Sequence, residues 1–199
     1  GGEEVDANSA SIGDTVNYQI TGTLPSNIDE YNTYYYQFTD TLSKGLTYTP
    51  DSLKVTINGT EVAASNYELT VSDYDKDKGT TITVEFTNLK GIDGVTIDKD
   101  TEVVVTYSAT LNEDAVIAGD GNPNDVKLTY SNDPNQSSGG ENDPKGETPK
   151  DEVITYTTEL TIKKTDDEGN ILPGAEFTLS GEGVNIVLVT EEVFTESAE

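Results

Sequence analysis

Apolar and polar residues alternate in short runs along most of the chain. Such runs occupy residues 15–22, 34–40, 53–62, 67–73, 80–87, 102–110, 126–132 and 152–164. Successive side chains of an extended strand point to opposite faces, so this alternation predicts strands that each bury one face. Closely spaced runs rich in Thr, Val and Tyr predict an all-β sandwich of the immunoglobulin-like kind.

Helix content should be low, because no stretch repeats its apolar residues at the helical period over three turns. Segments 88–101 and 111–118 have room only for a helical turn. Asn58-Gly59 separates two alternating runs and predicts a type I′ hairpin turn.

Two polar segments are interpreted as surface turns. The stretch "DYDKDKG" (73–79) spaces its acids like a calcium loop, but its glycine comes one place late and the twelfth position is not Glu, so a hairpin turn is favoured. The stretch "DGNPND" (120–125) gathers oxygen ligands without a known metal-binding spacing, and we expect a surface loop there.

The chain divides at a polar tract. Residues 133–152 contain no apolar side chain, which predicts an exposed loop or linker. We therefore expect one sandwich over 1–158 and the opening strands of a second sandwich over 159–199. The first and last residues resemble cut ends, so we interpret the sequence as a fragment.

Composition excludes several classes of function. The 199 residues carry a formal net charge of −27 with 11 basic residues, which is the opposite of a nucleic-acid-binding footprint. No run approaches the roughly 18 apolar residues of a membrane helix, so we expect no membrane insertion. Cys and His are absent, which removes thiolate nucleophiles, zinc–thiolate sites and most general-base chemistry. We expect no cofactor, no metal and no ordinary enzyme.

Four motifs in order along the chain resemble a known family. They are "IGDTVNYQI" (12–20), "FTDTLSKGLTY" (38–48), "VVTYSATLN" (104–112) and "LTYSNDP" (128–134). Together they resemble the fimbrial isopeptide-forming domain of sortase-assembled backbone pilins from Gram-positive bacteria. The stretch from Glu159 to Leu179 resembles the opening of a Cna protein B-type domain, with Lys164-Thr-Asp166, an acidic glycine turn and Leu-Pro-Gly-Ala-Glu-Phe.

The resemblance implies an intramolecular amide between a first-strand lysine and a late-strand asparagine, promoted by a nearby acid. Carried onto this sequence, Asn132 is the amide partner and Asp40 is the promoting acid, since Tyr36 and Phe38 place Asp40 on an apolar strand face. The lysine is expected upstream of Gly1. Burial would keep the acid protonated and the lysine neutral, and proximity would replace a cofactor.

Simpler interpretations of these residues stay open. Asn132 ends an alternating run before Asp133-Pro134 and could begin a turn. Asp40 could be an ordinary capping or turn acid. A cluster of tyrosines could form a sugar-binding or adhesive face, or it could be half core and half packing edge: Tyr31, Tyr34, Tyr35 and Tyr36.

In the second unit, Lys163 and Lys164 match the family's opening strand. Leu160 and Ile162 share a face with Lys164, which favours Lys164 as the reactive lysine, with a partner beyond Glu199. The alternative is a solvated cation paired with Asp166, an interaction that contributes little.

The resemblance implies a structural subunit of a covalently assembled surface pilus, located outside the cell on the wall or the pilus. Its implied partners are neighbouring pilin subunits, a sortase and a host surface ligand. The alternative is a wall-anchored adhesin that binds host glycan or matrix protein. Self-crosslinking would be the chain's one reaction.

Overall fold

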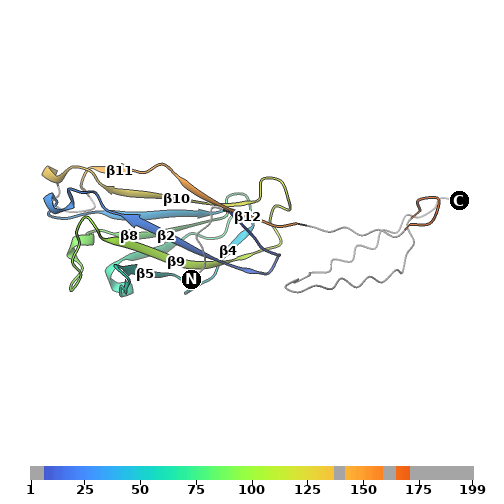
Figure 1. Ribbon diagram of the computed structural model, residues 1–199, viewed down its shortest axis with the longest axis horizontal. Helices are drawn as coiled ribbons and strands as arrows, with labels where there is room; N and C mark the ends of the chain where they lie inside the picture. The colour runs from blue at the N-terminus through green and yellow to red at the C-terminus, as the bar shows by residue number, and fades with distance from the viewer. Residues whose placement is uncertain (1–6, 137–141, 159–164, 171–199) are drawn as a thin grey trace. The chain divides into compact units, whose positions relative to one another are not determined.

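The computed structural model describes residues 7–136, 142–158 and 165–170 (Figure 1). Within these ranges the chain forms strands and short 3-10 turns, without an α-helix. The strands are β1 (Ala7–Ser9), β2 (Thr15–Thr23), β3 (Tyr36–Leu42), β4 (Leu46–Tyr48), β5 (Lys54–Ile57), β6 (Thr60–Glu61), β7 (Glu68–Val71), β8 (Thr80–Phe86), β9 (Glu102–Leu111), β10 (Asn122–Ser131), β11 (Lys145–Glu147) and β12 (Asp151–Tyr156). The 3-10 turns are Ile28–Glu30, Ala64–Asn66, Leu89–Gly91 and Pro134–Gln136. The predicted all-β class is confirmed.

The described strands form two sheets. One sheet has the order β1-β12-β10-β3-β8-β7, with β11 also paired to β10. The other has the order β2-β9-β5-β6, with β4 also paired to β9. Strand β10 is antiparallel to β3 along most of its length, while β12 and β11 take successive parts of its other edge. The order brings β3 and β10 together at the centre of one sheet.

The core forms where the alternating runs turn their apolar faces toward one another. Positions 36, 38, 40 and 42 of β3 are all buried, and the residues between them are half-buried. Strand β9 alternates in the same way and buries five of its ten residues. Because the period is two, each strand commits its whole apolar set to one face. Asp40 is the single acid in this series on β3.

The predicted turns are present. Asn58 and Gly59 have φ values of 50° and 78°, the left-handed pair that a type I′ turn requires. Asp75 and Gly79 exchange backbone hydrogen bonds of 2.9 and 2.6 Å, so the segment is a hairpin turn. Among the described residues there is no cluster of three or more candidate metal-ligating side chains.

The polar tract is not simply an exposed loop. Its residues Lys145–Glu147 form β11, which pairs with Ser131 to Thr129 of β10. Asp143 is buried and accepts a hydrogen bond from Thr33 at 3.2 Å. Lys145 also lies 3.8 Å from the ring centre of Tyr35. Sequence pattern missed this strand because its side chains are polar and its stability comes from backbone pairing and charged contacts.

The tyrosine cluster belongs to the interior. All four tyrosines are at most 5% exposed, which favours the core interpretation over an adhesive face: Tyr31, Tyr34, Tyr35 and Tyr36. Tyr31 and Tyr34 pack edge to face with ring centres 5.0 Å apart. Their burial holds the segment that leads into β3 in place. It therefore also determines which face of β3 carries Asp40.

Residue contacts divide the chain into two units, residues 1–157 and 158–199. This boundary falls one residue from the predicted one. Lys163 and Lys164 lie outside the described residues, so their predicted role stays a prediction. No helix in the described ranges is long and apolar enough to cross a membrane.

Candidate functional site

Asp40 lies in the middle of the sandwich. Its side chain is 2% exposed. Within the sheet, Asp40 of β3 lies opposite Ile82 of β8 on one side and opposite Val126 of β10 on the other. Its place on the inner face follows from the alternation of Tyr36, Phe38, Asp40 and Leu42. A carboxyl group in such surroundings has lost its hydration and needs partners or a proton.

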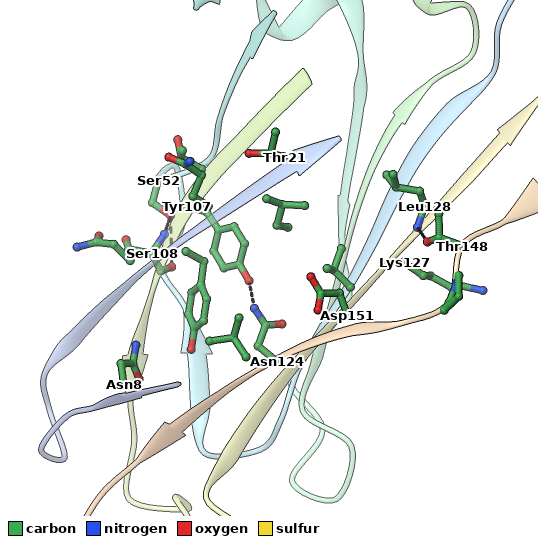
Figure 2. A pocket seen from close by; sticks show the side chains of 18 residues that line it. Asn8, Thr21, Ser52, Tyr107, Ser108, Asn124, Lys127, Leu128, Thr148 and Asp151 are labelled. Carbon is green, nitrogen blue, oxygen red and sulfur yellow. Dashed lines mark hydrogen bonds between the residues drawn. The ribbon is translucent and has the colours of Figure 1, made fainter. Parts of the chain in front are cut away.

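Two side chains from different strands join Asp40. The hydroxyl of Tyr107, in β9 of the opposite sheet, donates a hydrogen bond to Oδ2 of Asp40. The same hydroxyl accepts a hydrogen bond of 2.7 Å from Nδ2 of Asn124, in β10 (Figure 2). Tyr107 therefore bridges an acid and an amide that lie on neighbouring strands of the other sheet.

The ring of Tyr107 is held by stacking. Tyr18 of β2 pairs directly with Tyr107 and stacks on it with ring centres 5.2 Å apart. The hydroxyl of Tyr18 hydrogen-bonds instead to Thr155 at 3.1 Å. Burial raises the pKa of Tyr18 to about 12, and burial also raises the pKa of Tyr107, so both tyrosines keep their protons at neutral pH.

The titration of Asp40 is strongly perturbed. Burial raises its pKa from 3.8 to about 7. The Tyr107 hydroxyl, the Asn124 amide and the backbone of Thr41 each lower the pKa by less, and the charge of Asp125 raises it slightly. Asp40 can therefore hold or release a proton near neutrality, as a general acid–base group must.

The acid and the amide each keep one unused oxygen. Oδ1 of Asp40 and Oδ1 of Asn124 are buried, and neither has a hydrogen-bond partner within the described part of the chain. Asn124 is itself only 5% exposed. A buried acceptor without a donor costs about 1–3 kcal/mol, so these two neighbouring oxygens leave the site able to accept further hydrogen bonds.

A second buried asparagine nearby provides the contrast. Oδ1 of Asn122 accepts from the backbone N–H of Val116 at 2.8 Å, and its Nδ2 donates to the carbonyls of Val116 and Thr155 at 3.1 Å. Its polar atoms are all engaged in holding the loop before β10. Asn122 is therefore a structural residue, whereas Asn124 has spare hydrogen-bonding capacity.

The site opens into a groove of about 960 Å³. The groove lies between β2 and β9 of one sheet and β10 with the chain leading into β12 of the other (Figure 2). Its lining is mixed, with Ile20, Leu128 and Val153 beside Asn124 and Tyr107. An extended segment in this groove would place its side chains against the amide of Asn124.

The structure corrects the predicted position of Asn132. Strand β10 ends at Ser131, Asn132 is exposed, and its backbone N–H bonds to the carbonyl of Pro144 at 2.9 Å. Asp40 pairs with Val126, six residues earlier, so Asn132 is roughly 20 Å away along the strand. Asn132 begins the turn after β10, because β11 draws the chain away from the inner face.

Sequence reasoning also missed Asn124, although a signal was present. The segment 120–125 was expected to be a surface loop, but β10 begins at Asn122. Extending the alternation of Val126 and Leu128 backward would have placed Asn124 on the inner face beside Asp40. The glycines and the proline just before it suggested a loop and concealed that continuation.

The arrangement suits acyl transfer within the protein. Asp40 can exchange a proton, Asn124 offers a carboxamide carbon, and the groove admits a nucleophile. No lysine in the described ranges is hydrogen-bonded to either residue. Lys127 lines the groove, but its ammonium group is bound to Glu147 at 2.8 Å.

Comparison with known proteins identifies relatives of this chain. The family model for "Gram-positive pilin backbone subunit 2, Cna-B-like domain" matches residues 12–134, more than half of the chain. The trypsin-resistant surface T6 protein of Streptococcus pyogenes serotype M6 is 28% identical over 178 residues. That alignment covers 82% of this chain and 32% of the relative, so the chain spans about a third of the relative's length.

Solved structures are similar as well. BcpA, the major pilin subunit of Bacillus cereus, is 25% identical with a TM-score of 0.54, over 76% of this chain and 37% of that one. A C-terminal fragment of the major pilin GBS80 of Streptococcus agalactiae has a TM-score of 0.61 at 20% identity, over 84% of this chain and 57% of that one. The second likeness supports the sandwich fold.

Proposed function

This chain belongs to the Gram-positive family of pilin backbone subunits with a Cna-B-like domain, and from that premise we propose that it is a shaft segment of a covalently assembled surface pilus. Its partners would be neighbouring pilin subunits, joined by a sortase outside the cell. A wall-anchored adhesin for host glycan or matrix protein is the weaker proposal, because the tyrosines that suggested a binding face are buried.

The shaft segment would be stabilised by an intramolecular amide at Asp40 and Asn124. One observation carries this proposal: a buried acid and a buried amide, bridged by Tyr107, each keep an oxygen without a donor in the described part of the chain. A lysine amine entering the site would supply a donor to Asp40, and a proton on Asp40 would serve the carbonyl oxygen of Asn124. Asn124 replaces Asn132 as the partner because it lies at the acid, whereas Asn132 is exposed.

The reaction would convert a primary amine and a primary amide into a secondary amide and ammonia. The neutral lysine Nζ attacks Cγ of Asn124, forming the Cγ–Nζ bond. Protonated Asp40 polarises the carbonyl through a hydrogen bond to Oδ1 of Asn124. One carboxyl oxygen of Asp40 then takes the proton that the attacking nitrogen releases, while the other gives up the proton that the leaving nitrogen needs. The Cγ–Nδ2 bond breaks and ammonia leaves. The buried site supplies proximity and keeps the lysine uncharged.

The lysine would come from a strand that precedes Gly1, as the family resemblance implies. The groove beside Asn124 is large enough for an extended segment. Its closure would link the beginning and the end of the sandwich across more than a hundred residues. On the loop-closure model, such a link stabilises the fold by about 4–5 kcal/mol.

The experiment is intact-mass measurement of the parent chain that carries the preceding strand. The wild type should be lighter by one ammonia for this domain. Asn124→Ala and Asp40→Ala should each retain that ammonia, and Asn132→Ala, the matched control, should lose it as the wild type does. Loss of ammonia in Asn124→Ala would overturn the assignment of Asn124.

A further inference from the structure

We propose that Tyr107 is a catalytic residue of the amide-forming reaction, relaying a proton from Asp40 to the nitrogen that leaves Asn124. This inference rests on the proposed function and adds to it the route by which the leaving group acquires its proton. A carboxamide nitrogen is a poor leaving group until it is protonated, so the reaction needs a proton donor at Nδ2.

The hydroxyl of Tyr107 lies next to this leaving nitrogen. Nδ2 of Asn124 lies 2.7 Å from the hydroxyl oxygen of Tyr107. The Tyr107 hydroxyl in turn donates to Oδ2 of Asp40. The amide of Asn124 is near enough to lower the pKa of Asp40, but its hydrogen bond in the described structure runs to Tyr107. Tyr107 is therefore the bridge between the acid and the leaving nitrogen.

The protonation state of Tyr107 suits a relay. Burial and the adjacent Asp40 raise its pKa, so the hydroxyl keeps its proton and does not itself act as a base. A hydroxyl can give one proton and take another in a single event. At rest the Tyr107 hydroxyl donates to Oδ2 of Asp40 and accepts from Nδ2 of Asn124. When Nδ2 becomes basic in the tetrahedral intermediate, the hydroxyl turns its proton from Oδ2 to Nδ2, donates it there and receives the proton then held on Oδ2 of Asp40.

The protons balance over the whole reaction. Lysine Nζ carries an extra proton after it attacks Cγ of Asn124, and Oδ1 of Asp40 takes that proton. The proton on Oδ2 passes to Tyr107, and the Tyr107 proton passes to Nδ2. Ammonia leaves with the electron pair of the Cγ–Nδ2 bond. Asp40 and Tyr107 end in the protonation states in which they began, so no oxidant or cofactor is required.

The fold positions this hydroxyl rigidly. The ring of Tyr107 is stacked on Tyr18 at 5.2 Å and packs at 6.0 Å from the ring of Tyr48. Tyr107 is 3% exposed, so a phenylalanine can occupy the same space without the hydroxyl. Tyr48 offers a matched control, because it packs on the same ring while its hydroxyl makes no hydrogen bond to Asp40 or Asn124 in the described structure.

The test follows the rate of ammonia loss in the parent chain that carries the preceding strand. The chain is kept unfolded and unreacted in denaturant, refolded by dilution and sampled by intact mass. Tyr107→Phe should close the amide about a hundredfold more slowly than the wild type, the lower range for a lost general acid. Tyr48→Phe should close at the wild-type rate. Circular dichroism should show the same refolded sandwich in all three.

A second measurement uses the wild type alone. The closure rate is measured in mixtures of light and heavy water. A relay moves two protons together and predicts a curved dependence on the deuterium fraction, whereas a single transfer predicts a straight line. This measurement decides the question even if Tyr107→Phe does not refold.

The outcomes separate the two proposals. If the wild type loses no ammonia, the proposed function is wrong. If the wild type closes and Tyr107→Phe closes within about twofold of its rate, or the deuterium dependence is linear, Tyr107 only packs and the relay is wrong. A Tyr107→Phe variant slowed about a hundredfold, with a curved dependence in the wild type, supports the relay.

Discussion

Replacing Asp40 by Asn should change the pH dependence of folding in a defined direction. The folded pKa of Asp40 is about 7, above its ordinary value of 3.8, because burial disfavours the charged form. Between these two values the folded chain holds a proton that the unfolded chain has released. Stability contributed by this proton is therefore present at low pH and lost as pH rises toward 7.

The magnitude follows from the two pKa values. Each tenfold difference in proton affinity is worth about 1.4 kcal/mol, so Asp40 should remove about 4 kcal/mol from the free energy of unfolding between pH 4 and pH 8. The amide of the Asp40→Asn variant would keep the hydrogen bond from Tyr107 and cannot ionise. Within the described part of the chain, two titratable groups influence the pKa of Asp40. The charge of Asp125 on β10 raises the pKa of Asp40, and Tyr107 on β9 stays neutral because its own pKa is raised.

The assay is urea unfolding of this chain and of Asp40→Asn at intervals from pH 4 to pH 8. The variant should gain about 4 kcal/mol relative to the wild type across this range, most of it below pH 7. The many other acids affect both proteins alike and cancel in the difference. A difference that stays constant with pH, or that falls, would refute the claim that Asp40 is buried with a raised pKa.

Four further substitutions probe separate parts of the structure. The backbone N–H groups of Asp77 and Lys78 lower the pKa of Asp75, so the wild type should lose stability relative to Asp75→Asn as pH falls below about 4; a urea series extended down to about pH 2 checks the sign. Gly59→Ala should cost about 1–2 kcal/mol in urea unfolding, since φ at this position is 78°. Asn122→Ala should cost about 2–3 kcal/mol because it leaves the N–H of Val116 without its acceptor, and the exposed Asn132→Ala should change stability by less than about 0.5 kcal/mol. Equal costs for the two asparagines would contradict their different roles.

Alternation was enough to predict the fold and the inward position of Asp40. Residues 34–40 and 102–110 were correctly interpreted as the strands β3 and β9, and the same pattern put Asp40 on the inner face. Such predictions succeed because a period of two is imposed by the backbone and is independent of distant contacts. The turn at Asn58-Gly59 was also predictable locally, because Asn and Gly readily adopt the positive φ values that a type I′ turn requires.

Asn124, the proposed amide partner, was passed over for Asn132 because the limits of β10 are not visible in the local pattern. The sequence "LTYSNDP" continued the alternation to Asn132, but β10 ends at Ser131, which is paired with Lys145 of β11. The glycines and the proline before Asn124 indicated a loop, yet pairing with β3 and β12 keeps that stretch extended. Tertiary pairing overrode local preference at both ends of one strand.

Tyr107 illustrates a second limit. It was visible in sequence as one more inward residue of an alternating strand, with nothing to separate it from Val105 or Ala109. The role proposed for it depends on contacts that form only when the two sheets face each other and its hydroxyl meets Asp40 and Asn124. Contacts across the sandwich join residues far apart in sequence, and no short motif records them.

The most direct test of the account is to identify which asparagine is linked in the parent chain. The refolded protein is digested, and the branched peptide that contains the amide is sequenced by tandem mass spectrometry. Asn124 should be joined to a lysine from the strand preceding Gly1, with one ammonia lost. A link at Asn132, or an unmodified Asn124 in a fully folded chain, would contradict it.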